Sequence, residues 1–540
     1  MSRSFLGTVA RLAMLAATVS PATALAQRPG GQQGPPPIDS ALYVRTTPPS
    51  NPIIQRMHSE GTERGQAMRL AQVLLDSIGP RLNNSDRFDA GQRWLVQEYA
   101  KWGVPASQVA YGTWIKWNRG PTYMDLVSPR TRTLEATILG WSPGTNGRWI
   151  EADVVIPPQT TENWQQWAAN ARGKFVLYSP LNPSCRMRPQ VQEFGTPATV
   201  ARLDSVRRFN TADMADRLRP GGNPKVWPRE AGVAGMIGSN WSAYPGINKI
   251  FGSPKDADNV PTIDVSCEDY NLLYRLAANN QGPKVRFYAQ SENQGEQPVH
   301  NVIARIEGRE LPNEYIVLSA HYDSWDGGSG ATDNGTGTIT MMEAIRILKE
   351  VYPNPRRTII VGHWGGEEQG LNGSASWVAD NPEIVSRVHA GFNQDNGTGR
   401  IASVSPGPTV AGPMALAKYL MELPASMTGG IRLGNTGTPG TGGSDHSSFQ
   451  CMKAPLYGLG GVSWDYGSTT WHTNRDTYDK VIAEDLQNNA TLVAMMVYMA
   501  DQDPSLIARD VITMPNAQDG TPRPWPTCST GHRNTAASPR

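Results

Sequence analysis

Short apolar runs alternate with helical patterns along the second half of the chain, and this alternation restricts the fold more than any other feature. Residues 315–320 (YIVLSA), 358–362 (TIIVG) and 388–394 are apolar runs of strand length, and residues 335–349 and 484–500 have the spacing of helices. Strands that alternate with helices in this way build a largely parallel sheet with helices on its faces. We therefore predict an α/β fold in which a mostly parallel, mixed sheet is sandwiched by helices.

The first half of the chain contains two different kinds of pattern. Residues 66–79 and 90–103 carry apolar positions three and four apart, which predicts two amphipathic helices. From residue 122 to 286 the chain changes to short β-rich pieces, such as GKFVLYSP and GVAGMIGSNW, separated by a loop-rich stretch. We expect one discontinuous domain, residues 51–121 and 287–512, that is interrupted by a β-rich insert at 122–286.

The amino-terminal residues have the layout of a cleaved secretory signal. Arg3 and Arg11 precede a short apolar run, and the small-residue step Ala24-Leu25-Ala26 follows it. A membrane anchor would need about 20 uninterrupted apolar residues, and the run from Leu12 to Val19 is much shorter. We expect a signal peptide at 1–26, a secreted or periplasmic protein, and no membrane association of the mature form.

The composition argues against nucleic acid as a partner and predicts two flexible segments. The chain has 49 basic and 48 acidic residues, a net charge of +1, so no general attraction to nucleic acid is expected. Residues 27–50 are rich in Gly, Gln and Pro, which predicts a flexible segment. Residues 513–540 are rich in Pro, Ser and Asn, and we expect a loose carboxy-terminal tail.

The four cysteines are Cys185, Cys267, Cys451 and Cys528, an even number in a chain expected to be exported. Two disulfides are therefore compatible with an oxidising compartment, and free buried thiols are the alternative. We favour a Cys185–Cys267 pair because both residues lie in the expected insert. The wide spacing, without a Cys-x-x-Cys motif, argues against a thiolate metal site.

Acidic and imidazole side chains follow the predicted strands at the edge where functional groups gather in open α/β sheets. So many carboxylates close together would raise one another's pKa and oppose folding, unless one or two divalent cations neutralise them. Nitrogen and oxygen donors suit zinc, with manganese or cobalt as substitutes, and paired metals favour hydrolysis. The candidates in this region are His321, Asp323, Asp333, Glu367, Glu368 and Asp395.

The ordered set of motifs resembles the zinc exopeptidase family that contains leucyl-type aminopeptidases, glutamate carboxypeptidases and plasma glutamate carboxypeptidases. The β-rich insert in turn resembles a protease-associated domain. The similarity spans most of the chain after about residue 50. The motifs are SAHYDS (319–324), ATDNGTG (331–337), GGEEQG (365–370), NQDNG (393–397), GGSDHSSF (442–449) and WHTNRDTYD (471–479).

The resemblance implies two zinc ions per chain and a role for each candidate. Asp333 would bridge the ions, His321 and Asp395 would complete one, and Glu368 and His472 would complete the other. Glu367 would be the general base, which takes a proton from water and gives it to the leaving amine. Asp323 would orient the His321 imidazole. Asp476 could do the same for His472, or cap a turn.

The GGSDHSSF segment departs from the family pattern. Related aminopeptidases often carry a Tyr three residues before Ser-Asp-His that holds the developing oxyanion, and Thr441 occupies that place. The oxyanion contact could then come from His446, from a Tyr elsewhere such as Tyr466, or mainly from the metal. We take His446 as a site residue. His58, His300, His363, His389 and His532 match no motif, and we expect them to be structural or surface groups.

The resemblance leaves the direction of cleavage open. Ser-Asp-His and His-Thr-x-x-Asp-Thr are closer to the aminopeptidases, whereas Asp323-Ser324-Trp325 and the insert are closer to the carboxypeptidases. We favour an aminopeptidase acting on peptides, with a carboxypeptidase or dipeptidase as the alternative. A single-zinc glutaminyl cyclase or a receptor ectodomain without metal would lack the complete set of five ligands.

Overall fold

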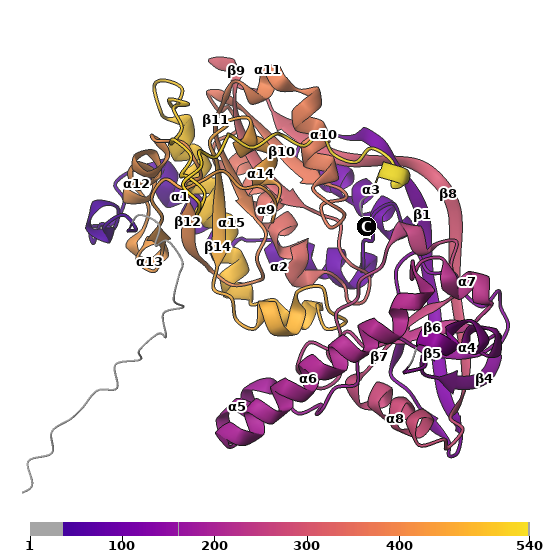
Figure 1. Ribbon diagram of the computed structural model, residues 1–540. Coiled ribbons are helices and arrows are strands. Elements are labelled where there is room, and N and C mark those ends of the chain that lie inside the picture. Colours follow the sequence, from indigo (N-terminus) through magenta and orange to yellow (C-terminus); the bar gives the residue numbers. More distant parts are fainter. Residues whose placement is uncertain (1–35, 160, 538–540) are drawn as a thin grey trace, which may run out of the picture.

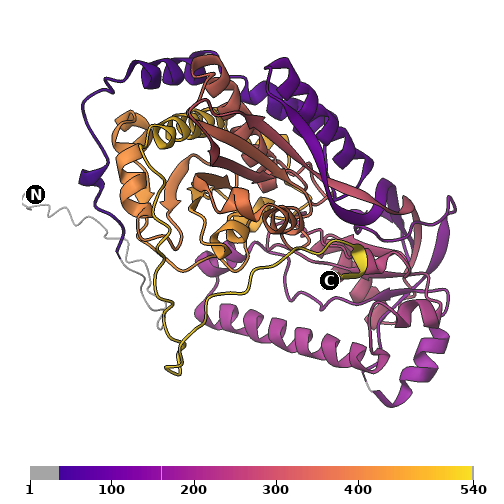
Figure 2. The same cartoon turned by 90° about the horizontal axis from the view of Figure 1, so that it is seen from above.

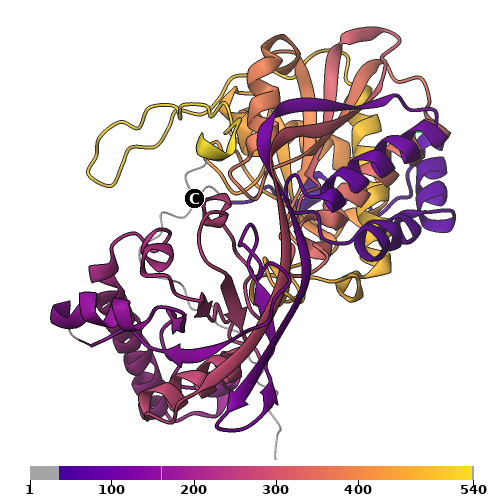
Figure 3. The same ribbon diagram turned by 90° about the vertical axis from the view of Figure 1, so that its right-hand side faces the viewer.

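Two long antiparallel strands join two lobes of the molecule. The computed structural model describes residues 36–159 and 161–537. Strand β1 (Ala106–Ser128) pairs with β8 (Lys284–Ile306) along its length, from Ala106 opposite Ala304 to Ser128 opposite Lys284. Both lobes therefore share one continuous ladder (Figures 1 and 3). The expected boundaries of the insert, near residues 122 and 286, fall inside these paired strands rather than in linkers.

The larger lobe contains the mostly parallel, mixed sheet that the sequence predicts. Its central strands are parallel, and antiparallel pairs occur between β12 and β14 and between β10 and β8. The strand order is β13-β12-β14-β11-β9-β10-β8. The strands are β9 (Leu311–His321), β10 (Arg357–Trp364), β11 (Val388–Gln394), β12 (Ile401–Ser405), β13 (Arg432–Leu433) and β14 (Leu456–Gly461).

Helices cover both faces of this sheet because its strands are apolar on both sides. In β9, Ile316 and Leu318 belong to the main core, whereas Tyr315 and Val317 belong to a second core on the opposite face. The main core packs against α1 (Pro52–Glu63), α2 (Ala67–Gln72) with its π-helical continuation (Val73–Ile78), α3 (Asp86–Lys101), α9 (Thr336–Val351) and α15 (Ala483–Asp501). The other face packs against α10 (Asn372–Asp380), α11 (Pro382–Val385) and α14 (His446–Cys451), while α12 (Gly412–Met421) and α13 (Ala425–Thr428) lie near the β13 edge.

The smaller lobe is built around the other half of this ladder, with strand order β3-β7-β6-β5-β4 and with β4 paired to β8. The β-rich pieces of the sequence form three of its strands. The strands are β3 (Ala136–Ile138), β4 (Ile150–Val155), β5 (Phe175–Leu177), β6 (Gly235–Gly238) and β7 (Thr262–Val265), followed by helix α8 (Cys267–Ala278); β2 (Arg132–Thr133) pairs with β1.

The stretch expected to be loop-rich within the insert is mainly helical. It contains α5 (Arg188–Phe194), α6 (Pro197–Leu218) and α7 (Trp227–Ala231), after α4 (Trp164–Asn170). Helix α6 extends as a long rod along one edge of the molecule (Figure 2). Only Met214 and Arg217 of α6 are buried. A helix that is polar on nearly all sides has no apolar stripe, so the hydrophobic pattern did not reveal it.

Two disulfides fasten segments that have little regular structure. Cys185–Cys267, the predicted pair, is confirmed, with 5.8 Å between the Cα atoms. Cys451–Cys528 attaches the carboxy-terminal tail to α14. The tail is also held where the Trp525 indole donates to the Cys451 carbonyl (2.7 Å). The tail expected to be loose thus follows the larger lobe. Its disulfide and hydrogen-bond partners lie far away in sequence, so local composition did not reveal these contacts.

The amino-terminal part of the chain is described from residue 36 onward. The expected signal peptide, 1–26, and the first part of the flexible segment lie outside the described residues. Within that segment, Ser40–Leu42 form a 3-10 turn, and the Ile38 amide donates to the Leu433 carbonyl (2.9 Å). In residues 36–159 and 161–537, every helix is too short or too polar to cross a bilayer.

Candidate metal centre

The predicted ligands meet at one edge of the larger sheet. His321 is the last residue of β9, and Asp395 follows directly after β11. Glu368 lies in the loop after β10, Asp333 in the irregular turn before α9, and His472 in the loop before α15. The carboxyl ends of parallel strands lie at the same edge of a sheet, which brings these otherwise distant residues together.

Asp333 lies between the two imidazoles. Its Oδ1 is 3.3 Å from His321 Nε2, and its Oδ2 is 3.0 Å from His472 Nε2. Asp395 Oδ1 is 3.0 Å from His321 Nε2, and Glu368 Oε2 is 2.9 Å from His472 Nε2. The donors therefore form two groups of three that share Asp333: His321, Asp333, Asp395 and Asp333, Glu368, His472.

This donor set fits a pair of divalent cations. Every donor is a carboxylate oxygen or an imidazole nitrogen, as zinc prefers. Glu368 Oε1 is buried without a hydrogen-bond partner among the described residues, although buried polar atoms are normally paired. A carboxylate that offers one oxygen to each of two histidine-containing groups has the arrangement expected of a bridging ligand.

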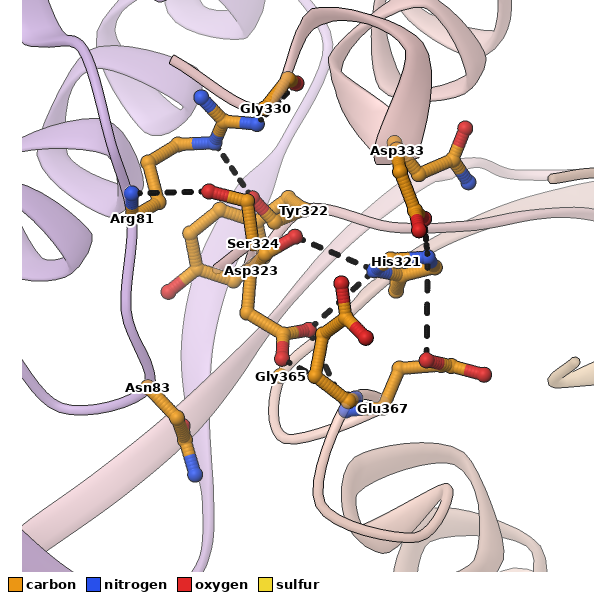
Figure 4. Close-up of polar contacts among 12 residues, drawn as sticks. Arg81, Asn83, His321, Tyr322, Asp323, Ser324, Gly330, Asp333, Gly365 and Glu367 are labelled. Atoms are coloured by element: carbon orange, nitrogen blue, oxygen red, sulfur yellow. Dashed lines mark hydrogen bonds and ion pairs between the residues drawn. The ribbon is translucent and has the colours of Figure 1, made fainter. Parts of the chain in front are cut away.

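Asp323 connects the end of β9 to the loop that carries the glutamates. The His321 Nδ1 atom is 3.1 Å from the Asp323 carbonyl oxygen and 3.5 Å from its carboxylate (Figure 4). The carboxylate also accepts hydrogen bonds from the amides of Glu367 (3.2 Å) and Glu368 (3.4 Å). The predicted contact with His321 is thus made most closely by the main chain, and the carboxylate additionally holds the glutamate loop.

Asp476 supports the Asp333 turn and not the His472 ring. Its carboxylate accepts hydrogen bonds from the amides of Thr332 (2.6 Å) and Asp333 (3.1 Å). The His472 Nδ1 atom has no hydrogen-bond partner in the described part of the chain. Of the two roles considered from the sequence, fixing a turn is the one that agrees with these contacts.

Arg81 is a supporting residue that sequence reasoning missed. Its side chain is fully buried and donates to the carbonyls of Tyr322 (2.5 Å) and Gly330 (2.9 Å) (Figure 4). It also donates to the carbonyl of Ser329 (2.8 Å). These bonds fix the chain between His321 and Asp333. The only signal in the sequence is one arginine in the GPRLNN stretch after a helix, and nothing local shows that its partners lie about 240 residues away.

A pocket of about 540 Å³ opens over the carboxylates of the candidate centre. Thr441 and Tyr466 line it, as do Trp471 and the tail residue Ser529. The structure places His446 outside this lining, with its Nδ1 atom 3.3 Å from the Asn393 amide nitrogen. Tyr466 therefore lines the pocket, whereas His446 does not.

Glu367 lies beside the ligands and also lines the pocket. One of its carboxylate oxygens is 3.9 Å from His321 Nε2. Burial raises the pKa of the Glu367 carboxyl well above its ordinary value; the positive charge of His321 opposes this rise, and Asp395 adds to it. A carboxyl with a raised pKa is suited to accepting a proton during a reaction.

Two buried histidines outside the motifs have structural partners, as expected. His363 Nε2 is 2.7 Å from the Tyr99 hydroxyl, and His389 Nε2 is 3.4 Å from the Asp503 carboxylate.

Asp445 is fully buried, and both of its carboxylate oxygens lack hydrogen-bond partners among the described residues.

Comparisons with known proteins identify the part of the chain that carries this centre. The model of peptidase family M28 matches residues 301–497. Carboxypeptidase Q of Rattus norvegicus is 26% identical over 326 residues, which cover 60% of this chain and 63% of the rat protein. The match thus spans slightly less than two thirds of that relative.

Two solved structures share the fold. A peptidase M28 precursor from Shewanella amazonensis has a TM-score of 0.59 at 21% identity, covering 88% of this chain and 98% of its own. An aminopeptidase from Aneurinibacillus sp. strain AM-1 has a TM-score of 0.50 at 19% identity, covering 85% and 98%. All five candidate ligands lie within residues 301–497, the segment that matches the model of peptidase family M28.

Proposed function

We propose that this protein is a secreted or periplasmic metal-dependent exopeptidase that hydrolyses terminal peptide bonds with a pair of zinc ions. The observation that carries the proposal is the position of Asp333, with one carboxylate oxygen toward His321 and the other toward His472. His321 and Asp395 would hold one ion, and Glu368 and His472 the other, with Asp333 shared.

The side chains around the pocket have complementary tasks. When bound, paired zinc ions would lower the pKa of a water molecule and polarise the substrate carbonyl. Glu367 takes the proton from the attacking water and delivers it to the leaving amine. Tyr466, which lines the pocket, supplies the hydroxyl that stabilises the oxyanion in place of the tyrosine that Thr441 replaces.

We favour cleavage from the amino terminus of a peptide. The pocket lining contains four carboxylates, and none of its described residues is Lys or Arg. Three of these carboxylates are assigned to the ions, which leaves Glu367 to attract a free α-ammonium group, whereas a terminal carboxylate would need a cationic side chain nearby.

A carboxypeptidase or dipeptidase is the second candidate, and Lys249 of the insert favours it. The Lys249 ammonium is 3.8 Å from the centre of the Trp471 ring, which lines the pocket. The similarity to carboxypeptidase Q points the same way. Cleavage of a peptide panel blocked at one end or the other separates the candidates, because an aminopeptidase cleaves only peptides with a free amino terminus.

Substitution of the proposed base tests the chemistry. Glu367→Gln should lower turnover by roughly 10²–10⁴-fold, since a positioned general base contributes about that much. Zinc content by elemental analysis should stay at two per chain. Glu383→Gln, an exposed glutamate in α11, is the matched control and should keep full activity. Near-normal turnover of Glu367→Gln would contradict the assignment.

A further inference from the structure

A segment of the insert lies directly against the loop that carries His472. We call residues 240–251 the docking segment and residues 466–476 the His472 loop. The Ile250 amide donates to the His472 carbonyl (2.7 Å), and the Asn474 amide donates to the Asn248 carbonyl (3.0 Å). The Ser242 hydroxyl donates to the Ser468 carbonyl (2.7 Å). The two segments thus pair through their main chains, although about 220 residues separate them.

Aromatic rings from both lobes enclose the His472 imidazole. Phe251, at the end of the docking segment, meets it edge-on with 5.3 Å between ring centres. Trp471 stacks on it at 4.1 Å, and the Lys249 ammonium lies over the Trp471 ring. The insert therefore touches the ligand directly through Phe251 and indirectly through Trp471.

The backbone of His472 has a conformation that needs support. Its φ is +57°, in the left-handed region that residues other than glycine rarely adopt. Such a conformation persists when surrounding contacts hold it. The hydrogen bond from the Ile250 amide is formed by the carbonyl of this same residue.

Asn248 joins the docking segment to the core of the insert. Its side-chain amide donates to the Val265 carbonyl in β7 (2.6 Å) and to the Asp264 carboxylate. Its main-chain amide donates to the Asn474 side chain (3.0 Å). Asn248 is 3% exposed, so this link between the insert sheet and the His472 loop is shielded from water.

We infer that the insert is a working part of the metal centre, because its docking segment holds His472 in the conformation that binds metal. This inference rests on the proposed two-zinc function. Loosening the docking segment should weaken the ion held by Glu368 and His472. The ion held by His321 and Asp395 should be affected less, because those two residues are fixed by β9 and β11. Asn248, Ile250 and Ser242 are thus positioning residues.

Zinc titration of the full chain tests this inference. The metal-free protein is titrated with zinc against a chromophoric chelator, which yields a dissociation constant for each ion. Asn248→Ala should weaken one of the two ions by at least about 10-fold, the range seen when groups that orient a ligand are removed. Ser242→Ala, which removes a single contact with the loop, should weaken the same ion by less and is the second variant if Asn248→Ala does not fold.

The matched control is Asn259→Ala, because the Asn259 side chain donates to the Pro224 carbonyl within the insert and has no hydrogen bond to the His472 loop in the described part of the chain. It should bind both ions as the wild type does. Two unchanged constants in folded Asn248→Ala and Ser242→Ala proteins, or equal weakening of both ions, would overturn the inference. A wild type that binds fewer than two zinc ions would instead overturn the proposed function.

Discussion

The two halves of the metal centre are supported in different ways. The sheet-supported half, His321 and Asp395, lies at the ends of two buried neighbouring strands, and the His321 side chain is fully buried. The loop-supported half, Glu368 and His472, comes from two loops, and the His472 side chain is 12% exposed. Asp323 steadies one of these loops, and the insert steadies the other.

This difference shows how a metal centre can combine a fixed part with an adjustable one. Residues at strand ends inherit their positions from the sheet, whose hydrogen bonds and core leave little freedom. Residues on loops depend on a few specific contacts, so their positions respond to single substitutions. We expect mutations to affect the two halves unequally, and the following predictions test that expectation.

The largest effect should follow from loss of the residue that the halves share. Asp333→Ala removes the carboxylate that faces both histidines, so both ions should be lost and activity should fall by about 10³-fold or more. Elemental analysis after dialysis measures the zinc content. Asp510→Ala, an exposed aspartate outside the centre, is the control. Retention of one tightly bound ion would show that the halves are independent.

A smaller and one-sided effect should follow from Asp323→Ala. This change removes the acceptor of the Glu367 and Glu368 amides and should loosen the glutamate loop. The ion held by Glu368 should bind about 10- to 100-fold more weakly, as is usual when a group supporting a ligand is lost. Zinc titration monitors both ions. Asp323→Asn keeps one acceptor oxygen and should restore part of the affinity. A larger loss of affinity for the ion held by His321 than for the ion held by Glu368 would contradict the comparison between the two halves.

The same contrast explains which residues the sequence could reveal. His321 and Asp395 follow apolar runs that predict β9 and β11, so local pattern and strand direction together bring them to one edge. His472 follows no predicted strand, and its assignment as a ligand came from its motif alone. Its position depends on Asn248 and Ile250, more than 200 residues earlier in the chain.

Arg81 escaped sequence reasoning for a related reason. It satisfies carbonyl groups of a distant loop, a task that requires neither a periodic pattern nor a metal-ligand spacing. Asp476, for which the sequence left two roles open, satisfies amides of the Asp333 turn. Helix α6 was missed because nearly all of it faces solvent, which leaves no apolar stripe to detect. Local patterns thus predict buried elements and their ends better than the contacts between distant loops.

The smallest effect concerns the stability of the sheet itself. His363 in β10 is fully buried, and burial lowers its pKa to about 3 from an ordinary value of 6.5. The unfolded chain therefore takes up a proton below about pH 6.5 that the folded chain does not bind until about pH 3. The free energy of unfolding therefore decreases as the pH falls through this window, by about 2 kcal/mol between pH 7 and pH 5. In His363→Phe, this contribution should be absent at both pH values, whatever the constant cost of the unpaired Tyr99 hydroxyl. Denaturant unfolding of the metal-free wild type and variant at pH 7 and pH 5 measures the difference. If the free energy of unfolding fell equally in both proteins between pH 7 and pH 5, His363 would not be the group that makes the sheet-supported half sensitive to acid.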